Sequence, residues 1–379
     1  MQTPVRLLLA LLAFIPAAAP AQQADADGFR PLFNGRDLTG WVVVNTAPST
    51  WSFNEDGYLV CSGKPIGEIR TERMYQNFIL ELEWRHLKPR GNAGIFVWAD
   101  DITARGQPFH RGIEVQVLEN AYGQSQGHTT HGDIFPIHGA TMTPENGRGG
   151  GRAFPTEERS KPSPEWNHYR IECRDGEISL AVNGKVVTRG RDCLPRKGYL
   201  CIESEGGIVH YRNVRIKELP DTPIDPAHVA IAARGYRSLY TGVDLSGWKT
   251  AGEGWKSADW VLASQAGAAP LVGETALDGD VGFVVDFKLA KESGQPRYGI
   301  RGATLALTHP RLAPLLEETG RWNRLEGTLT GDRLTLHLNG KPVPDPDALL
   351  TPGATTGPVT LTPDGPMDWA NIYVRDLKP

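Results

Sequence analysis

The sequence has little of what would mark several common classes of protein. No apolar stretch beyond residue 21 approaches the roughly 20 residues that a membrane-spanning helix requires. Lysine and arginine number 40 against 44 acidic residues, for a formal charge of −4, and no basic stripe is available for nucleic acid or an anionic membrane surface. No window shows sustained helical periodicity. We therefore expect neither a nucleic-acid partner, nor a membrane partner, nor a helical bundle.

Cysteine is also scarce, and its placement is uneven. The four cysteines, Cys61, Cys173, Cys193 and Cys201, all lie in the first part of the chain. An even number in an exported protein permits disulfides, with three possible pairings among which the sequence cannot choose. The alternative is that they are small apolar residues on strands, since Cys173 and Cys201 lie in strand-like runs.

The N-terminus has the pattern of an export signal. Arg6 is followed by a short apolar run over residues 7–15 and by Ala19-Pro20-Ala21, which offers small residues at the cleavage positions. This predicts a signal peptide over residues 1–21 and a periplasmic or secreted mature protein. The residues that remain exceed what one core usually serves, so two domains are expected.

Two halves of the chain repeat each other. Phe33-Asn34-Gly35-Arg36-Asp37-Leu38-Thr39-Gly40-Trp41 returns as Tyr240-Thr241-Gly242-Val243-Asp244-Leu245-Ser246-Gly247-Trp248, and Trp166-Asn167 followed by Asn183-Gly184 returns as Trp322-Asn323 followed by Asn339-Gly340. One fold is therefore predicted twice, over residues 28–219 and, shortened in its middle, over residues 236–379. Residues 220–235 are the expected linker.

Both halves have the patterns of β-strands. Residues 78–84 and 169–174 alternate apolar and polar side chains, and Asp175-Gly176 and Asn183-Gly184 are typical hairpin turns. Many short strands separated by such turns predict an all-β protein of two tandem antiparallel β-sandwich, or jelly-roll, domains.

The strongest candidate for chemistry is the strand at 113–120 of the first half. Ile113, Val115 and Val117 are expected to face the core, with Glu114 and Gln116 on the opposite face. Strict alternation would turn Glu119 inward, where an unpaired carboxylate is costly, whereas a bulge near residue 118 would place it beside Glu114. Two carboxylates could then share general acid and base catalysis. The alternative is an ordinary solvated polar face.

The long segment 121–165 has no good counterpart in the second half. It carries His128 and His131 and few apolar residues, and structureless loops of this length are usually functional or disordered. Two histidines without a placed third ligand are weak evidence for a metal, so we predict no metal ligands here and expect His131 to act in catalysis or to contact substrate. Glu83, on a neighbouring strand, is either part of a surface charge cluster or lines the same cleft.

Four of these motifs, in this order, resemble the 3-keto-disaccharide hydrolase family, whose members are also described as 3-keto-glycoside lyases and hydratases. They are residues 32–41, 91–96 and 114–120, and the run from Glu165-Trp166-Asn167 to Asn183-Gly184. The resemblance runs from about Phe29 to Leu219 and implies a concanavalin A-like jelly roll acting on a carbohydrate. Related β-glucanases carry the pattern E-x-D-x-x-E, where this chain has Glu114-x-Gln116-x-x-Glu119.

The implied substrate suggests a mechanism. A ketone at sugar carbon 3 acidifies the proton on carbon 2, so a base can remove that proton while an acid assists departure of the glycosidic group. Glu114 is the expected base or acid, with Glu119 or His131 as its partner. Gln116, Asn92, Glu83 and His128 are the expected substrate contacts. No cofactor is expected, although a structural Ca²⁺ is compatible with the fold. A conventional β-glucan hydrolase and a non-catalytic carbohydrate-binding protein remain as alternatives.

Overall fold

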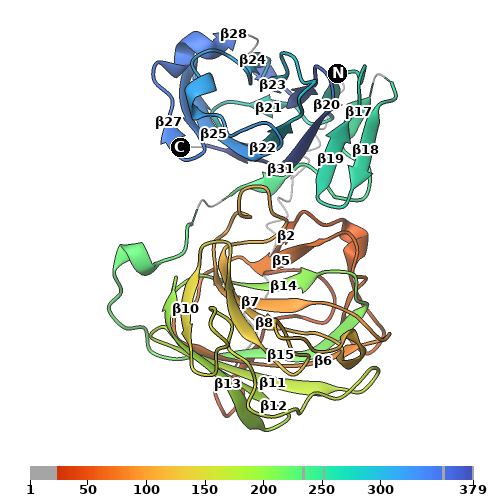
Figure 1. Ribbon diagram of the computed structural model, residues 1–379, viewed down its shortest axis with the longest axis vertical. Coiled ribbons are helices and arrows are strands. Elements are labelled where there is room, and N and C mark those ends of the chain that lie inside the picture. The colour runs from red at the N-terminus through yellow and green to blue at the C-terminus, as the bar shows by residue number, and fades with distance from the viewer. Residues whose placement is uncertain (1–23, 233–234, 251, 352–354, 378–379) are drawn as a thin grey trace, which may run out of the picture.

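The chain forms two all-β sandwich domains built from antiparallel strands (Figure 1). The computed structural model describes residues 24–232, 235–250, 252–351 and 355–377, so the predicted signal peptide lies outside the described residues. Strands of residues 30–218 form two sheets, and strands of residues 237–376 form the sheets of the second domain. Among the described residues, no helix has the length and apolar character needed to cross a membrane.

The first domain pairs a larger sheet with a smaller one. The larger sheet has the order β10-β13-β12-β11-β6-β15-β4-β3, with β1 paired to β15. Its strands are β1 (Arg30–Pro31), β3 (Trp51–Phe53), β4 (Leu59–Cys61), β6 (Phe78–His86), β10 (Thr141–Pro144), β11 (Asn167–Arg174), β12 (Glu177–Val182), β13 (Lys185–Leu194) and β15 (Val209–Glu218).

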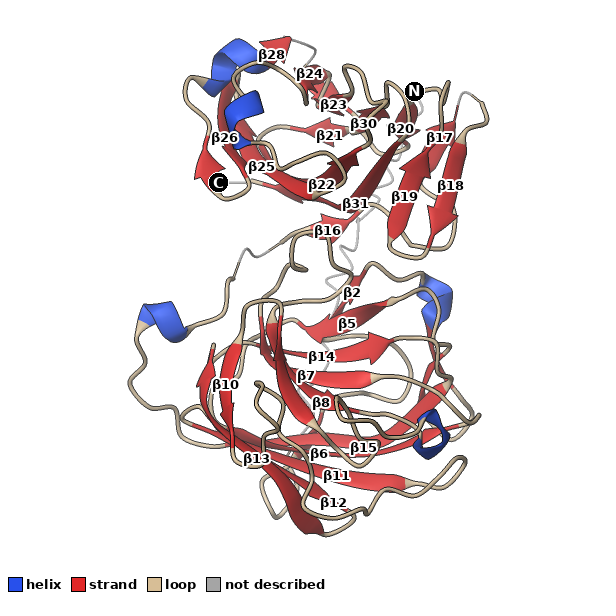
Figure 2. Cartoon of the chain, in the orientation of Figure 1, coloured by secondary structure: helices blue, strands red, loops and turns tan. Residues whose placement is uncertain are grey.

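The smaller sheet has the order β2-β5-β14-β7-β8-β9. Its strands are β2 (Trp41–Val44), β5 (Gly67–Thr71), β7 (Gly94–Ala99), β8 (Gly112–Gln116), β9 (Ile134–Ile137) and β14 (Tyr199–Ser204). The short 3-10 helices η1 (Pro48–Thr50) and η2 (Asn120–Tyr122) lie in the connections (Figure 2).

The core between the two sheets follows from the alternation of each strand. Leu80, Leu82 and Trp84 of β6 face Ile113 and Val115 of β8 across one buried cluster. Because side chains alternate along a strand, the intervening residues of β6 and β8 point outward on opposite sides of the sandwich. This geometry decides below which polar residues can share a site.

The second domain repeats the strand order of the first. Its larger sheet runs β18-β19-β31-β22-β25-β26-β27, with β16 paired to β31, and its smaller sheet runs β17-β20-β30-β23-β24-β28. The strands are β16 (Arg237–Ser238), β17 (Trp248–Thr250), β18 (Trp255–Ala258), β19 (Val261–Ser264), β20 (Leu271–Gly273), β22 (Val281–Leu289), β23 (Arg297–Ile300), β24 (Ala303–Ala306), β25 (Trp322–Thr330), β26 (Arg333–Leu338), β27 (Lys341–Pro342), β28 (Leu350–Thr351), β30 (Thr360–Thr362) and β31 (Met367–Asp376), with β21 (Leu277–Asp278) and β29 (Thr356–Gly357) forming a separate pair and η3 (Pro226–His228), η4 (Ala313–Leu315) and η5 (Pro346–Leu349) in connections.

Equivalent side chains form the same hydrogen bonds in both domains. The indole N–H of Trp41 donates to the Leu32 carbonyl at 2.8 Å, and that of Trp248 donates to the Leu239 carbonyl at 2.8 Å. The amide of Asn183 donates to Asn167 Oδ1 at 3.0 Å, as Asn339 does to Asn323 at 2.9 Å. The sequence repeat is thus a structural repeat.

One expectation about the middle of the chain was wrong. Segment 121–165 is not a structureless loop, because it supplies β9 to the edge of the smaller sheet and β10 to the edge of the larger one. The second domain also keeps strands at the places of β7 and β8, namely β23 and β24. The outward residues of β24 are Thr304 and Ala306, so this strand lacks the carboxylate and amide side chains that β8 carries at Glu114 and Gln116.

Loop 100–111 of the first domain contacts the second domain at several points. The Gly106 N–H donates to Asp286 Oδ2 at 2.8 Å, and the Asn371 amide donates to the carbonyls of Ala104 and Gln107 at 3.2 and 3.0 Å. Asp286 is fully buried and is paired with Arg324. The second domain therefore holds this loop in place.

All four cysteine thiols are free and buried. Cys61, Cys173 and Cys193 belong to the main core of the first domain, and Cys201 lies on the other face of the smaller sheet with Phe96. The alternative of small apolar residues on strands is the one the structure supports.

Candidate functional site

The outer face of the smaller sheet, meaning the face turned away from the core, carries an unusual set of carboxylates. Its strands β5, β14, β7 and β8 are neighbours, and their register places Glu203 opposite Glu68, and Gly94 opposite Gln116. Ile202 lies opposite Ile95, so Glu203 is also opposite Gly94. Adjacent strands are about 4.8 Å apart, which brings these polar side chains within reach of one another.

Gly94 makes room for two of the carboxylates. A Cβ atom at this position would lie 2.7 Å from Oε1 of Glu114 and 3.0 Å from Oε2 of Glu203. Both carboxyl groups therefore lean over the same point of β7. Glu114 is 6 % exposed and Glu203 is 1 % exposed, so neither is an ordinary solvated surface residue.

Amide side chains connect the cluster to a third carboxylate. Asn92 donates a hydrogen bond to Glu205, and its own oxygen accepts one from the Gln116 amide at 2.9 Å. Arg152 lies 3.4 Å from Gln116 Oε1 and forms an ion pair with Asp133 at 3.0 Å. Glu205 is only partly buried and is thus the member of the cluster most open to solvent.

The electrostatics of the cluster favour protonated acids. Burial, followed by the charge of Glu205, raises the pKa of Glu114 well above its usual 4.5. Burial also raises the pKa of Glu205, to about 7. Several carboxylates in one buried site cannot all ionise together, because desolvation and mutual repulsion both oppose the charged form. The cluster therefore holds exchangeable protons near neutral pH, as acid–base catalysis requires.

Glu119, in contrast, does not join Glu114. Strand β8 ends at Gln116 with no bulge, so alternation turns Glu119 toward the interior, where it is 3 % exposed. Its carboxylate accepts backbone N–H bonds from Arg90 at 2.7 Å, Ala121 at 2.8 Å and Ser163 at 3.0 Å. Burial opposes its charge, but these donors prevail and hold the pKa of Glu119 below 4.5. It fastens three loop segments together.

The two predicted histidines also lie apart from the carboxylate cluster. His131 Nδ1 lies 2.7 Å from Ser160 Oγ, and burial lowers the pKa of its imidazole. His128 contacts Ser125 Oγ at 2.8 Å and the Gly123 carbonyl at 3.1 Å. Neither bonds to Glu114 or Gln116, and the ring nitrogens of the two histidines contact different partners. Segment 129–133 reaches the cluster instead through Asp133 and Arg152.

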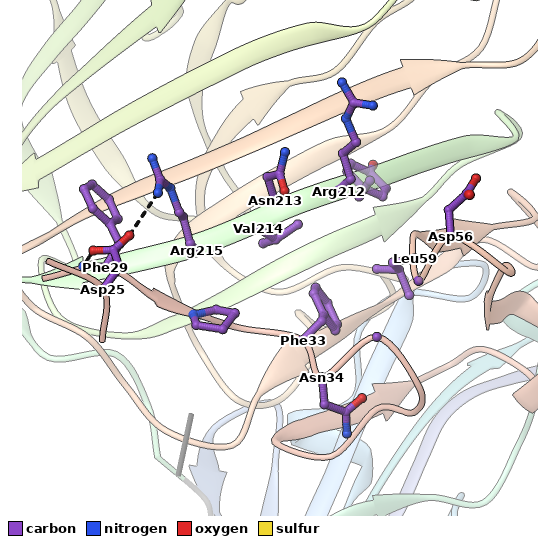
Figure 3. A pocket seen from close by; sticks show the side chains of 14 residues that line it. Asp25, Phe29, Phe33, Asn34, Asp56, Leu59, Arg212, Asn213, Val214 and Arg215 are labelled. Atoms are coloured by element: carbon purple, nitrogen blue, oxygen red, sulfur yellow. Dashed lines mark hydrogen bonds and ion pairs between the residues drawn. The ribbon is translucent and has the colours of Figure 1, made fainter. Parts of the chain in front are cut away.

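The expectation that Glu83 lines the same cleft was wrong. It lies on β6 of the larger sheet and points outward there, with the whole core between it and Glu114. Its carboxylate pairs with Arg212 at 3.0 Å. Nearby, Figure 3 shows a pocket on that sheet, between β1, β4 and β15, lined by Asp25, Phe29, Phe33, Asn34, Asp56, Arg212, Asn213 and Arg215 among others. Its two arginines are already paired with carboxylates, Arg215 with both Asp25 and Glu81.

The structure therefore brings together Glu114, Gln116 and Asn92, which the sequence had singled out, with Glu203 and Glu205, which it had not. A signal for them existed, because Cys201, Glu203 and Glu205 alternate with Ile202 and Ser204 just as Glu114 and Gln116 alternate with valines. What was absent was any indication that β14 lies two places from β8 in the same sheet.

Several known proteins are similar to about half of this chain. A 3-keto-disaccharide hydrolase of Bacteroides thetaiotaomicron is 24 % identical over 239 aligned positions, which cover 52 % of this chain and 80 % of that protein. Among solved structures, a Parabacteroides distasonis protein provisionally named as a glycosyl hydrolase is 24 % identical, with a TM-score of 0.39 over 52 % of this chain and 95 % of its own. A β-glucanase of Bacillus licheniformis is 12 % identical, with a TM-score of 0.34 over 51 % of this chain and 97 % of its own.

The family model described as the 3-keto-alpha-glucoside-1,2-lyase-like domain matches residues 28–217. That interval begins just before β1 and ends within β15, so it contains both sheets of the first domain and all of the carboxylate cluster. The chain belongs to the 3-keto-alpha-glucoside-1,2-lyase-like domain family.

Proposed function

We propose that the first domain cleaves 3-keto-glycosides, and that the carboxylate cluster of Glu114, Glu203 and Glu205 is its catalytic centre. The observation that carries the proposal is the convergence of Glu114 and Glu203 over Gly94, beside Glu205, which Asn92 contacts and whose pKa is about 7. The family match and the name of the Bacteroides relative support the substrate class.

The chemistry needs one base and one acid. The base removes the proton from carbon 2, whose electrons form an enolate with the ketone at carbon 3. The enolate then expels the glycosidic oxygen from carbon 1, and the acid gives that oxygen a proton. Addition of water to the resulting enone completes a net hydrolysis. Hydrogen-bond donors at the enolate oxygen lower the barrier because charge develops there.

The environments of the acids suggest how the roles divide. Two carboxyl groups whose pKa values are pushed apart serve as base and acid respectively. Glu205 is the more solvent-accessible group, with a pKa of about 7, and would lose its proton first and act as the base. Glu114, whose pKa is held well above 4.5 by burial, would keep its proton and act as the acid. Asn92, Gln116 and Arg152 would donate hydrogen bonds to the sugar or enolate.

The geometry disfavours a β-glucanase mechanism. The pattern E-x-D-x-x-E would need Glu119 beside Glu114, but Glu119 is occupied by three backbone N–H groups. Gln116 holds Asn92 and carries no charge to replace an aspartate.

The test is to incubate the purified protein with a 3-keto-glucoside carrying a chromogenic aglycone, and in parallel with the unoxidised glucoside. We expect aglycone release from the keto-sugar only. Glu205→Gln and Glu114→Gln should each lower turnover by about 10²-fold or more, whereas Glu177→Gln, on the exposed surface of the larger sheet, should not. Binding of the keto-sugar without turnover would instead establish a carbohydrate-binding protein. Full activity of both cluster variants would reject the assigned site.

A further inference from the structure

Three metal-ligand side chains meet beside the carboxylate cluster. Glu68 lies on β5, Cys201 on β14 and His110 at the end of loop 100–111, just before β8. Each offers one ligand atom, and these atoms lie within 4.8 Å of one another. All three side chains are fully buried. None of them has a role in the chemistry proposed above.

The contacts within this trio leave polar atoms without partners. His110 Nδ1 faces both Glu68 Oε1 and, at 3.8 Å, Cys201 Sγ, while the His110 backbone N–H donates to Glu68 Oε1 at 2.9 Å. Two further buried atoms, Glu68 Oε2 and His110 Nε2, have no hydrogen-bond partner. Buried polar groups are nearly always satisfied, so the orphaned Oε2 of Glu68, on a carboxylate that already faces His110 Nδ1, points to a ligand within the trio.

Charge balance points to a cation. Glu68 is directly opposite Glu203 in the sheet register, and Glu114 lies near both. The guanidinium of Arg70, which also faces this region, is engaged with the carbonyls of Thr71 and Asp101. A divalent ion held by one carboxylate, one thiolate and one neutral imidazole forms a site with no net charge, which lowers the cost of burying the carboxylate.

We propose that Glu68, His110 and Cys201 bind one divalent metal ion of the zinc class. Thiolate, imidazole and carboxylate are the donors that Zn²⁺ takes in proteins, whereas Ca²⁺ takes six to eight oxygens. In a tetrahedral zinc site the sulfur and nitrogen ligands are about 3.5 Å apart, close to the 3.8 Å between Cys201 Sγ and His110 Nδ1. Three protein ligands leave a fourth position for water or another small ligand.

The second domain helps to build this site. Thr103 Oγ1 lies 2.9 Å from the Tyr373 hydroxyl, and the Gly106 N–H is held by Asp286, so loop 100–111 is fixed at two places shortly before His110. A ligand on a constrained loop binds metal with a smaller entropy loss than one on a free loop. This gives the degenerate second domain a role that its own sheets do not suggest.

The experiment uses the full chain stripped of metal with a chelator and then titrated with Co²⁺. We expect one Co²⁺ per chain, a thiolate-to-cobalt absorption band in the near ultraviolet and a rise in Tm. Cys201→Ser should abolish the band, and Glu68→Gln should weaken binding at least tenfold. Cys193→Ser is the matched control, because it places the same hydroxyl at another buried thiol in the core of the larger sheet.

The proposal does not depend on the keto-glycoside reaction, since every readout concerns the metal. It is overturned if the chain retains no stoichiometric Co²⁺ or Zn²⁺ after dialysis, or if the cobalt band persists in Cys201→Ser. Should Cys201→Ser fail to fold, an unchanged Co²⁺ affinity in Glu68→Gln overturns it equally. The trio would then be a buried histidine–glutamate pair packed beside a thiol.

Discussion

Replacing Glu119 by Gln separates a structural carboxylate from a catalytic one. Oε2 of Glu119 accepts two backbone N–H bonds and Oε1 accepts one. Glutamine keeps the shape but presents one oxygen, removes the charge and turns an NH₂ group toward a backbone donor. The loss of one or two charge-assisted bonds, together with an unsatisfied buried N–H, should cost about 2–4 kcal/mol. For a domain of this size that is about 5–15 °C in Tm.

The dependence on pH gives this prediction a second measurement. The folded pKa of Glu119 lies below 4.5, so its stabilising contribution is complete above that value and is lost as pH falls through the folded pKa. The stability difference between wild type and Glu119→Gln should therefore be largest at neutral pH and shrink in acid. Urea unfolding followed by circular dichroism at several pH values measures it, with the first-domain transition treated separately if the two domains unfold apart.

Turnover at a temperature where the variant is folded completes the test. If Glu119 only fastens loops, kcat on a 3-keto-glucoside should stay within about twofold of wild type, since no reacting group has changed. A variant as stable as wild type, or one that is stable but loses about 10²-fold in kcat as general acid–base residues do, would show that the backbone contacts of Glu119 are incidental and that it belongs with the chemistry.

Three further predictions concern other residues. Because Glu205 has a pKa of about 7 and is proposed as the base, kcat/KM should rise as pH increases through about 7, and this limb should vanish from the residual activity of Glu205→Gln; a limb unchanged in the variant would assign it to another group. Gly94→Ala adds a methyl group 2.7 Å from Glu114 Oε1, so we expect about 1–3 kcal/mol of destabilisation by urea unfolding and a fall in kcat; unchanged kinetics would remove Glu114 from the centre. Asp286→Ala leaves the partly buried Arg324 guanidinium unpaired, which should cost about 3 kcal/mol and speed hydrogen exchange at the Gly106 amide; exchange as slow as in wild type would show that Asp286 does not hold the loop.

Predictions for the site residues were correct where the interacting strands are consecutive in the sequence, and they failed where the interacting strands are far apart in it. Gln116 and Asn92 were placed correctly because they lie on or beside two consecutive strands, β7 and β8, which pair as a hairpin. The role expected for Glu119 required a β-bulge after β8, and the role expected for Glu83 required β6 to lie in the same sheet as β8. Neither condition can be predicted from the residues of a single strand. Glu205 directly follows β14, about ninety residues after β8, and only the closed sandwich brings it to Asn92.

The sequence by itself determined the all-β class, the tandem repeat and the inward and outward faces of the strands. These follow from local period-two alternation, from turn residues and from the paired tryptophan and asparagine motifs, all of which act over short stretches of chain. The tertiary structure alone decided which strands are neighbours, and so which carboxylates share a desolvated site. Alternation along a strand predicts whether a side chain is buried or points outward. It does not predict which sheet the strand joins, because that depends on pairing with strands far away in the sequence, and hydrogen-bond geometry and core packing together determine the register of that pairing.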